Sequence, residues 1–311
     1  MTGPGATWAA QASGDAEALR AALEAHLHAY RYGTRAEGGR LWLLLPHREA
    51  LPWHLPLSRR RLRLRPRPLA YEPVATALVD FLIARMPGGT VLDIGAEIGY
   101  FAHLAASRAD LDLSVHAFEM RPDHLARLEE RTAALGLDRV RAHLAGMSDR
   151  ERGTRPIWYS VTRMFETEPP SSAYRDPVWR QLKFRLKGRP GRDRLQRAEV
   201  RVDSIDSFCA REGVRPGLVK IDVDGYEGRV VAGGAETFRA ARPAVLLELH
   251  RRRFLAPHGD SRGGVVRALL DLGYRGWRAS DPGDLARCRM LPLSPGCRDL
   301  ARDRTDLLLF L

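Results

Sequence analysis

The chain of 311 residues is poor in cysteine and has no arrangement of cysteines that is typical of a metal site. Its three cysteines, Cys209, Cys288 and Cys297, are too few and too scattered for a disulfide framework. No Cys-x-x-Cys pair is present, which argues against structural zinc. Because the chain also begins without a basic stretch followed by an apolar one, we expect no secretory signal and a cytoplasmic location.

Long apolar runs are missing as well. The longest, such as residues 41–46 and 307–311, extend over only a few positions, whereas a membrane-spanning helix needs about 20. We therefore expect no membrane partner. Apolar residues make up 44% of the chain and charged residues 28%, a balance that excludes a coiled-coil rod, a collagen-like chain and a mostly disordered chain.

Lysine is the third scarce residue, although the chain is strongly basic. The net charge is +12 and the pI is near 10.3, yet the chain contains only Lys183, Lys187 and Lys220. With abundant Ala, Gly, Pro and Leu, this arginine bias indicates a GC-rich genome, so nucleic acid is disfavoured as a partner. The arginine-rich segment 58–68 is interpreted as a solvated connector, with a polyanion clamp as the alternative.

Two parts of the chain differ in their pattern. Residues 1–70 predict an α+β extension, with an amphipathic helix over 15–30, a strand over 40–46 and the arginine-rich connector. From 71 to 311 strands alternate with helices, which predicts an α/β, doubly wound, mostly parallel sheet. The expected strands are 90–96, 114–120, 139–147, 218–224, 244–250, 274–279 and 306–311. The expected helices are 71–86, 100–108, 122–135, 204–212, 226–241 and 264–273.

Residues 148–199 interrupt this alternation and predict an irregular insertion. The segment carries six aromatic residues: Trp158, Tyr159, Phe165, Tyr174, Trp179 and Phe184. Beside a ligand site such an insertion can act as a lid that selects substrate. The alternative is an ordinary elaboration whose aromatic side chains pack inward.

The loop after the first strand of the second part has a distinctive glycine spacing. In such sheets ligands bind at the carboxyl ends of the strands. This end has Asp93, Gly95 and Gly99, in the pattern Asp-x-Gly-x-x-x-Gly. A dinucleotide loop needs a glycine where Glu97 stands, and Glu97 would repel a pyrophosphate. The loop therefore favours a cationic ligand without phosphate, such as S-adenosylmethionine. A purely structural turn is the alternative.

The next two strand ends also carry polar groups. Glu119 lies 26 residues after Asp93, where an acidic residue can accept hydrogen bonds from ribose hydroxyls. An exposed glutamate at a strand end is the alternative. Residues 145–149, which include Met147, Ser148 and Asp149, end the third strand, where an adenine edge would be bound; this signal is weaker.

The fourth and fifth strands end in the densest acidic cluster of the chain. Asp222 and Asp224 are two residues apart, as are Glu248 and His250, so each pair is expected to share a face of its strand. Glu227 falls in the first turn of the following helix. Such crowding needs a cation, a proton or a hydroxyl-bearing ligand. The alternatives are a helix-capping role for Glu227 and a surface position for His250.

Together these motifs resemble the FkbM family of S-adenosylmethionine-dependent methyltransferases, from about residue 71 to the end of the chain. Two positions depart from the family pattern: Glu97 replaces Asn, and Asp224 replaces Glu. The matching elements, in the family's order, are Tyr71-Glu72-Pro73, Val91 to Phe101, Phe118-Glu119-Met120, Ile205-Asp206-Ser207, Lys220 to Glu227, Arg242-Pro243 and Glu248-Leu249-His250.

The resemblance implies a Rossmann-like class I methyltransferase sheet whose last strand is antiparallel. It also implies O-methylation of a hydroxyl on a natural product or a sugar-containing small molecule, in secondary metabolite biosynthesis. The residues expected to bind the cofactor are Glu72, Asp93, Gly95, Ala96, Gly99, Tyr100, Glu119, Met120, Met147, Ser148 and Asp222.

The source of the catalytic base stays open at this point. An alcohol must lose its proton, so Asp222 is the first candidate base and His250 the second, with Asp224 beside them. Alternatively, Asp222, Asp224 and Glu248 hold Mg²⁺, which prefers oxygen ligands. The competing functions are an RNA methyltransferase, a non-catalytic binding module of the same fold and, less favoured, a nicotinamide oxidoreductase. A homodimer is a further expectation.

Overall fold

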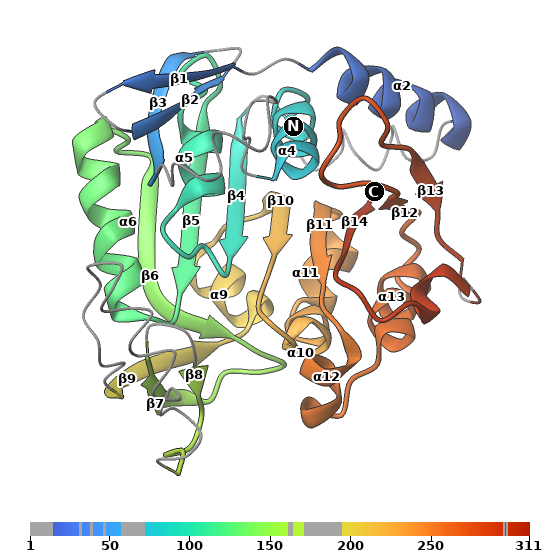
Figure 1. Ribbon diagram of the computed structural model, residues 1–311. Helices are drawn as coiled ribbons and strands as arrows, with labels where there is room; N and C mark the ends of the chain where they lie inside the picture. The colour runs from blue at the N-terminus through green and yellow to red at the C-terminus, as the bar shows by residue number, and fades with distance from the viewer. Residues whose placement is uncertain are drawn as a thin grey trace, which may run out of the picture.

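Figure 1 shows the computed structural model, in which helices cover a long mixed sheet. The structure describes residues 15–30, 33–37, 40–45, 48–56, 72–86, 88–160, 164–170, 195–294, 296 and 298–311. The arginine-rich connector, Tyr71, Cys297 and most of the insertion, including its predicted Tyr174, Trp179 and Phe184, lie outside these residues.

One sheet organises the described part of the chain. Its strand order is β13-β12-β14-β11-β10-β4-β5-β6-β9-β7-β8. The strands are β4 (Gly89–Ile94), β5 (Leu113–Glu119), β6 (Val140–Met147), β7 (Gly153–Tyr159), β8 (Met164–Phe165), β9 (Gln196–Asp203), β10 (Pro216–Ile221), β11 (Ala244–Leu249), β12 (Gly276–Ala279), β13 (Met290–Pro292) and β14 (Asp306–Phe310).

The direction of the strands confirms the predicted sheet. Strands β11, β10, β4, β5, β6 and β9 are parallel, and β14 is antiparallel to β11. The chain runs outward from β4 through β5 to β6 and returns to β10 on the other side of β4 (Figure 1). The strand order therefore reverses between β4 and β10, where an open α/β sheet binds its ligand.

Helices cover both faces of the parallel strands, because these strands are apolar on both sides. The helices are α2 (Ala16–Ala29), α4 (Pro73–Ile83), α5 (Tyr100–Ala106), α6 (Pro122–Leu135), α9 (Ile205–Glu212), α10 (Glu227–Ala232), α11 (Ala235–Ala241), α12 (Arg252–Leu255) and α13 (Arg262–Asp271). Neighbouring strand residues alternate between two cores: Val91 and Leu218 face α4 and α5, whereas Leu92 and Val219 face α9, α11 and α13.

The insertion at 148–199 is more regular than expected. It contains β7 and the first half of β9, which pair antiparallel and extend the sheet beyond β6. The prediction of an irregular segment was therefore wrong for these residues. Arginines and Pro156 obscure the alternation that would have indicated the strands. The lid function stays a prediction.

The helix expected at 226–241 is two helices. It breaks at Gly233-Gly234, between α10 and α11. A Cβ atom at Gly233 would lie 2.0 Å from the carbonyl oxygen of Ser148, so the chain passes too close to β6 for any side chain. A contact between segments so far apart in the sequence cannot be found from helical periodicity.

The N-terminal part contributes a helix to the main core. Leu23 and Leu27 of α2 are fully buried in the same cluster as α4, and Glu24 Oε1 accepts a hydrogen bond of 2.8 Å from the Met290 N–H. Strands β1 (Gly33–Glu37), β2 (Arg40–Leu45) and β3 (Arg48–Pro56) form a separate antiparallel sheet, of which only the central strand was expected. The domain boundary near residue 70 stays a prediction.

Candidate active site

The loop after β4 lies directly against the end of β10. Gly95 has a φ of 78°, and a Cβ atom there would lie 1.7 Å from the carbonyl oxygen of Asp222. The Asp222 N–H donates a hydrogen bond of 3.0 Å to the Ile94 carbonyl. Only glycine fits between the two strand ends. The loop after β4, residues 95–99, here called the cofactor loop because it is predicted to bind the cofactor, and the first candidate base are thus parts of one rigid junction.

Asp93, near the end of β4, links the loop to the start of α5. Its side chain is buried, and Oδ2 accepts a hydrogen bond of 3.0 Å from the Ala102 N–H in the first turn of α5. Burial raises the pKa of Asp93, while the nearby Lys220 ammonium opposes the shift. Asp93 therefore anchors the start of α5, where Gly99 takes a φ of 87°.

Two further predicted residues are structural neighbours of this loop. The Ala96 N–H donates a hydrogen bond of 2.9 Å to the Phe118 carbonyl, and the Ala96 side chain is buried. The Tyr100 hydroxyl is buried and lies 2.9 Å from Thr76 Oγ1 on α4. Both residues hold the loop in place, and the side chains of both are buried.

Glu119 stands at the end of β5, with one carboxylate oxygen bonded to the loop after β4 and the other to the residues that follow β5. Oε2 accepts a hydrogen bond of 2.9 Å from the Glu97 N–H, and Oε1 accepts one of 2.8 Å from the Arg121 N–H. Burial raises the pKa of Glu119 to about 7, against the opposing effect of these two donors. Each oxygen keeps a second lone pair, which is what a ribose diol requires.

Glu97 has an unusual backbone for a glutamate. Its φ of 50° is left-handed, a region that favours Gly and Asn over residues with long side chains. Asparagine at this position, as in the family pattern, would adopt the same turn with less strain. The departure at Glu97 therefore costs stability and adds a negative charge within the loop itself.

Replacing Glu97 with asparagine should therefore stabilise the protein. We expect Glu97→Asn to raise the free energy of unfolding by about 0.5–1 kcal/mol in urea titrations, because asparagine tolerates the left-handed turn. The exposed Glu130 on α6 is the control, since Glu130→Asn should lower stability in an ordinary helical backbone. A loss of stability in both variants would contradict the strain at Glu97.

The end of β6 is less open to a ligand than its sequence suggested. Met147 and Ser148 are buried, and the Ser148 hydroxyl donates a hydrogen bond of 2.9 Å to Asp149 Oδ1. Met120 packs over this strand, because a Cβ atom at Gly146 would lie 2.7 Å from its sulfur. These side chains offer an adenine ring an apolar wall and few free polar groups.

Lys220 is a site residue that the sequence analysis missed. Its buried Nζ lies 3.3 Å from the Gly95 carbonyl oxygen, 3.3 Å from Asp222 Oδ2 and 3.5 Å from Asp93 Oδ1. Burial disfavours its charge, but Asp222 and Asp93 outweigh burial and hold the pKa of Lys220 above its usual range. A lysine inside an apolar strand of an arginine-rich chain was the available signal.

Glu72 is a further acidic residue near this ammonium. It is half-buried at the start of α4 with a φ of 41°. Its charge raises the pKa of Lys220 and that of Glu248. The structure thus brings Glu72, from ahead of β4, to the same strand ends as Asp222.

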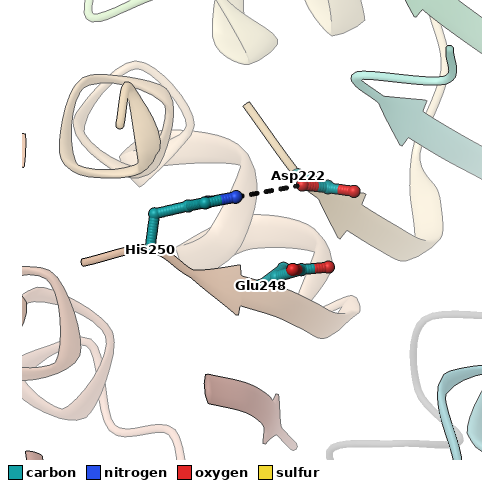
Figure 2. Close-up of side chains that lie close together, drawn as sticks. All are labelled: Asp222, Glu248 and His250. Carbon is teal, nitrogen blue, oxygen red and sulfur yellow. Dashed lines mark ion pairs between the residues drawn. The ribbon is translucent and has the colours of Figure 1, made fainter. Parts of the chain in front are cut away.

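Asp222, Glu248 and His250 meet at the ends of β10 and β11 (Figure 2). One donor atom of each lies within 4.8 Å of the others. His250 Nε2 lies 3.9 Å from Asp222 Oδ1, and the Asp222 side chain keeps 27% of its surface exposed. The three side chains come from the ends of two adjacent strands, as predicted; Asp222 and Glu248 are partly exposed, and His250 is buried.

Asp224 is placed differently from the expectation. Strand β10 ends at Ile221, so the alternation that would put Asp222 and Asp224 on one strand face no longer applies. Asp224 has a φ of 49° in the following turn and its side chain is 83% exposed. Its Oδ1 nevertheless lies 3.1 Å from His250 Nε2, a hydrogen bond that lowers the pKa of Asp224.

The charges around His250 decide its protonation. Burial alone would lower the pKa of His250, but hydrogen bonds to Asp224 and Glu227 outweigh burial and raise it to about 10. Burial and the charges of Asp222 and Glu72 raise the pKa of Glu248 to about 7. At neutral pH the free site therefore holds an imidazolium, which donates hydrogen bonds rather than accepting a proton.

The donor set matches Mg²⁺ poorly. In the structure the group that could hold a metal ion is Asp222, Glu248 and His250, whereas the sequence analysis suggested Asp222, Asp224 and Glu248. Mg²⁺ prefers oxygen ligands, and His250 would have to lose its proton before its nitrogen could bind any metal. The buried Lys220 ammonium already balances part of the acidic charge.

Comparison with known proteins identifies the family. The model of the FkbM methyltransferase domain matches residues 93–275, which include the cofactor loop and the whole acidic cluster. The chain belongs to the FkbM family of S-adenosylmethionine-dependent methyltransferases. The 31-O-demethyl-FK506 methyltransferase FkbM of Streptomyces tacrolimicus is 30% identical over 214 residues, which are 63% of this chain and 76% of that protein.

Solved structures related to this FkbM-family chain are distant. A methyltransferase FkbM from Methylobacillus flagellatus aligns with a TM-score of 0.42 and 14% identity, over 72% of this chain and 44% of that one. A SAM-dependent O-methyltransferase from Thermotoga maritima aligns with a TM-score of 0.36 and 12% identity, over 83% and 71%. The chain thus spans less than half the length of the Methylobacillus protein. Among the described residues, no helix has the length and apolar character needed to cross a membrane.

Proposed function

We propose that the chain transfers the methyl group of S-adenosylmethionine to a hydroxyl oxygen of a small molecule, such as a natural product or a sugar-containing compound. The observation that carries this proposal is the position of Asp222. Its backbone lies under Gly95 in the cofactor loop, and its half-exposed carboxylate lies beside His250 and Glu248. The Streptomyces relative, whose name describes an O-demethyl substrate, supports an oxygen acceptor.

The residues around the loop fit the cofactor. Glu119 is suited to accept hydrogen bonds from the ribose hydroxyls, and the glycine loop lets the backbone approach the ligand closely. The surplus of carboxylates at Glu72, Asp93 and Asp222 suits a ligand that carries a sulfonium and an ammonium group. When bound, the cofactor supplies an electrophilic methyl group.

The chain's own residues then have to place and deprotonate the acceptor. Lys220 Nζ and His250 Nε2 flank the Asp222 carboxylate at 3.3 and 3.9 Å and hold it in place. An ionised Asp222 accepts the hydroxyl proton as the oxygen attacks, while placement of that oxygen in line with the methyl group supplies much of the rate enhancement. Because His250 is protonated in the free site, it serves better as a hydrogen-bond donor to the acceptor than as the base.

Cofactor binding should depend on pH through Glu119. Because the ionised carboxylate accepts both ribose hydroxyls and its pKa lies at about 7, we expect S-adenosylhomocysteine to bind about tenfold more weakly at pH 6 than at pH 8. Calorimetric titration at both pH values measures this. Glu119→Gln should bind weakly at both, and equal affinity of the unmodified protein at the two pH values would contradict the assignment.

The proposed reaction can be tested with methyl-tritiated S-adenosylmethionine and a panel of polyols, sugars and hydroxylated natural products. Label that resists alkaline hydrolysis in an organic-soluble product is the expected result, because an ether is stable to base whereas a methyl ester is not. Label only in esters or amines, or in added RNA, would overturn the proposal in favour of another acceptor class.

A further inference from the structure

Glu227 is a buried carboxylate to which the proposed reaction assigns no role. It begins α10, its side chain is 0% exposed, and its Oε1 lies 2.5 Å from His250 Nδ1. We propose that Glu227 is a positioning residue, which holds the His250 imidazole so that its Nε2 is directed at the acceptor oxygen. This inference rests on the proposed function, because it assigns His250 to the acceptor side of that site.

The geometry of the imidazole ring carries the argument. The two nitrogens lie on opposite edges of the ring, so a partner at Nδ1 fixes the direction of Nε2. With Nδ1 held by Glu227, Nε2 faces Asp224 at 3.1 Å and Asp222 at 3.9 Å. The ring of Phe254 packs edge-on against His250, with centroids 5.9 Å apart, and limits its rotation.

The two carboxylates that lie within hydrogen-bond distance of His250 differ in what they can do. Asp224 is 83% exposed, and ion pairs in water contribute little to the order of a side chain. Glu227 is fully buried, where breaking a charge pair is strongly unfavourable. Glu227 therefore fixes the ring, whereas an acceptor hydroxyl can replace Asp224 at Nε2.

The backbone around Glu227 is built to keep it in place. The Gly225 N–H donates a hydrogen bond of 3.2 Å to the same Oε1. Gly225 has a φ of 111°, and a Cβ atom there would lie 2.4 Å from the Phe254 carbonyl oxygen, so the turn is pressed against α12. The capping role considered from the sequence does not account for the contact with His250, and no side chain caps the start of α10.

Substitutions at Glu227 separate positioning from a structural role. Glu227→Gln keeps an oxygen that can accept from Nδ1, and Glu227→Ala removes it. We expect turnover to fall about 10–100-fold in Glu227→Ala and less in Glu227→Gln, with the affinity for S-adenosylhomocysteine within about twofold of the unmodified protein. Glu236→Gln, at an exposed glutamate of α11, is the matched control and should change neither quantity.

A double-mutant cycle with His250→Gln tests whether Glu227 acts through His250. If it does, the double variant Glu227→Gln/His250→Gln is no slower than His250→Gln alone. The proposal would be overturned if the loss of turnover in the double variant were the product of the losses in the two single variants. A loss of cofactor affinity equal to the loss of turnover would also overturn it.

NMR spectra of the imidazole nitrogens test the contact itself, without any acceptor. The unmodified protein should show an Nδ1 proton of His250 protected from exchange, and Glu227→Gln should shift it even if Glu227→Ala fails to fold. An unshifted His250 signal would overturn the positioning role. A shifted signal in a protein that methylates no hydroxyl compound would instead uphold the contact between Glu227 and His250 and refute the proposed reaction.

Discussion

Gly95→Ala should abolish the binding of S-adenosylhomocysteine and destabilise the protein by about 3 kcal/mol. The added Cβ atom would lie 1.7 Å from the carbonyl oxygen of Asp222, in a backbone whose φ of 78° already disfavours alanine. The loop and the end of β10 would have to separate, which moves the cofactor loop and the candidate base together. Calorimetry measures the binding, and urea titration measures the free energy of unfolding.

Gly136 provides the matched control for this substitution. It ends α6 with a φ of 60°, and a Cβ atom there would meet nothing within 4 Å. Gly136→Ala should therefore cost about 1 kcal/mol of stability through its backbone alone and leave binding intact. Equal effects of the two substitutions would contradict the role given to the contact between Gly95 and Asp222.

Asp222→Asn should lower turnover at least about 100-fold, because an amide cannot take up the hydroxyl proton. The affinity for S-adenosylhomocysteine should change much less, since the backbone of residue 222 keeps its contact with the loop after β4. Steady-state rates on an acceptor found in the tritium assay, together with calorimetry, separate the two quantities.

The control for Asp222→Asn is Asp271→Asn, at an exposed aspartate of α13 away from the strand ends. It should leave turnover and binding unchanged. If Asp222→Asn methylates the same acceptor at the unmodified rate, Asp222 is not the base, and the acidic cluster serves only to balance the charge of the ligand.

The position of the site could be predicted because parallel strands end at one edge of the sheet. Asp93, Glu119, Asp222 and Glu248 each end or follow an apolar run, and the strand order brings these ends together. His250 was included for the same reason. The hydrogen-bond partner of each side chain depends on rotamers and turns, which residue spacing alone does not predict.

Asp224 and Lys220 show where such rules stop. The alternation of strand faces placed Asp224 beside Asp222, but β10 ends at Ile221 and the next residues form a turn. Lys220 lies within the strand, so a search of strand ends passes over it although its ammonium joins three parts of the site. The misplacement of Asp224 and the omission of Lys220 both depend on where β10 ends. Apolar patterns in a sequence locate strand ends poorly.

The most direct test of the central claim is a calorimetric titration of the purified protein with S-adenosylhomocysteine, with NAD⁺ as the comparison ligand. The Asp-x-Gly-x-x-x-Gly loop, together with Glu119, leads us to expect saturable binding of S-adenosylhomocysteine at one site and none of NAD⁺. A folded protein that binds NAD⁺, or that binds neither ligand, would contradict a methyltransferase site at the ends of β4 and β5.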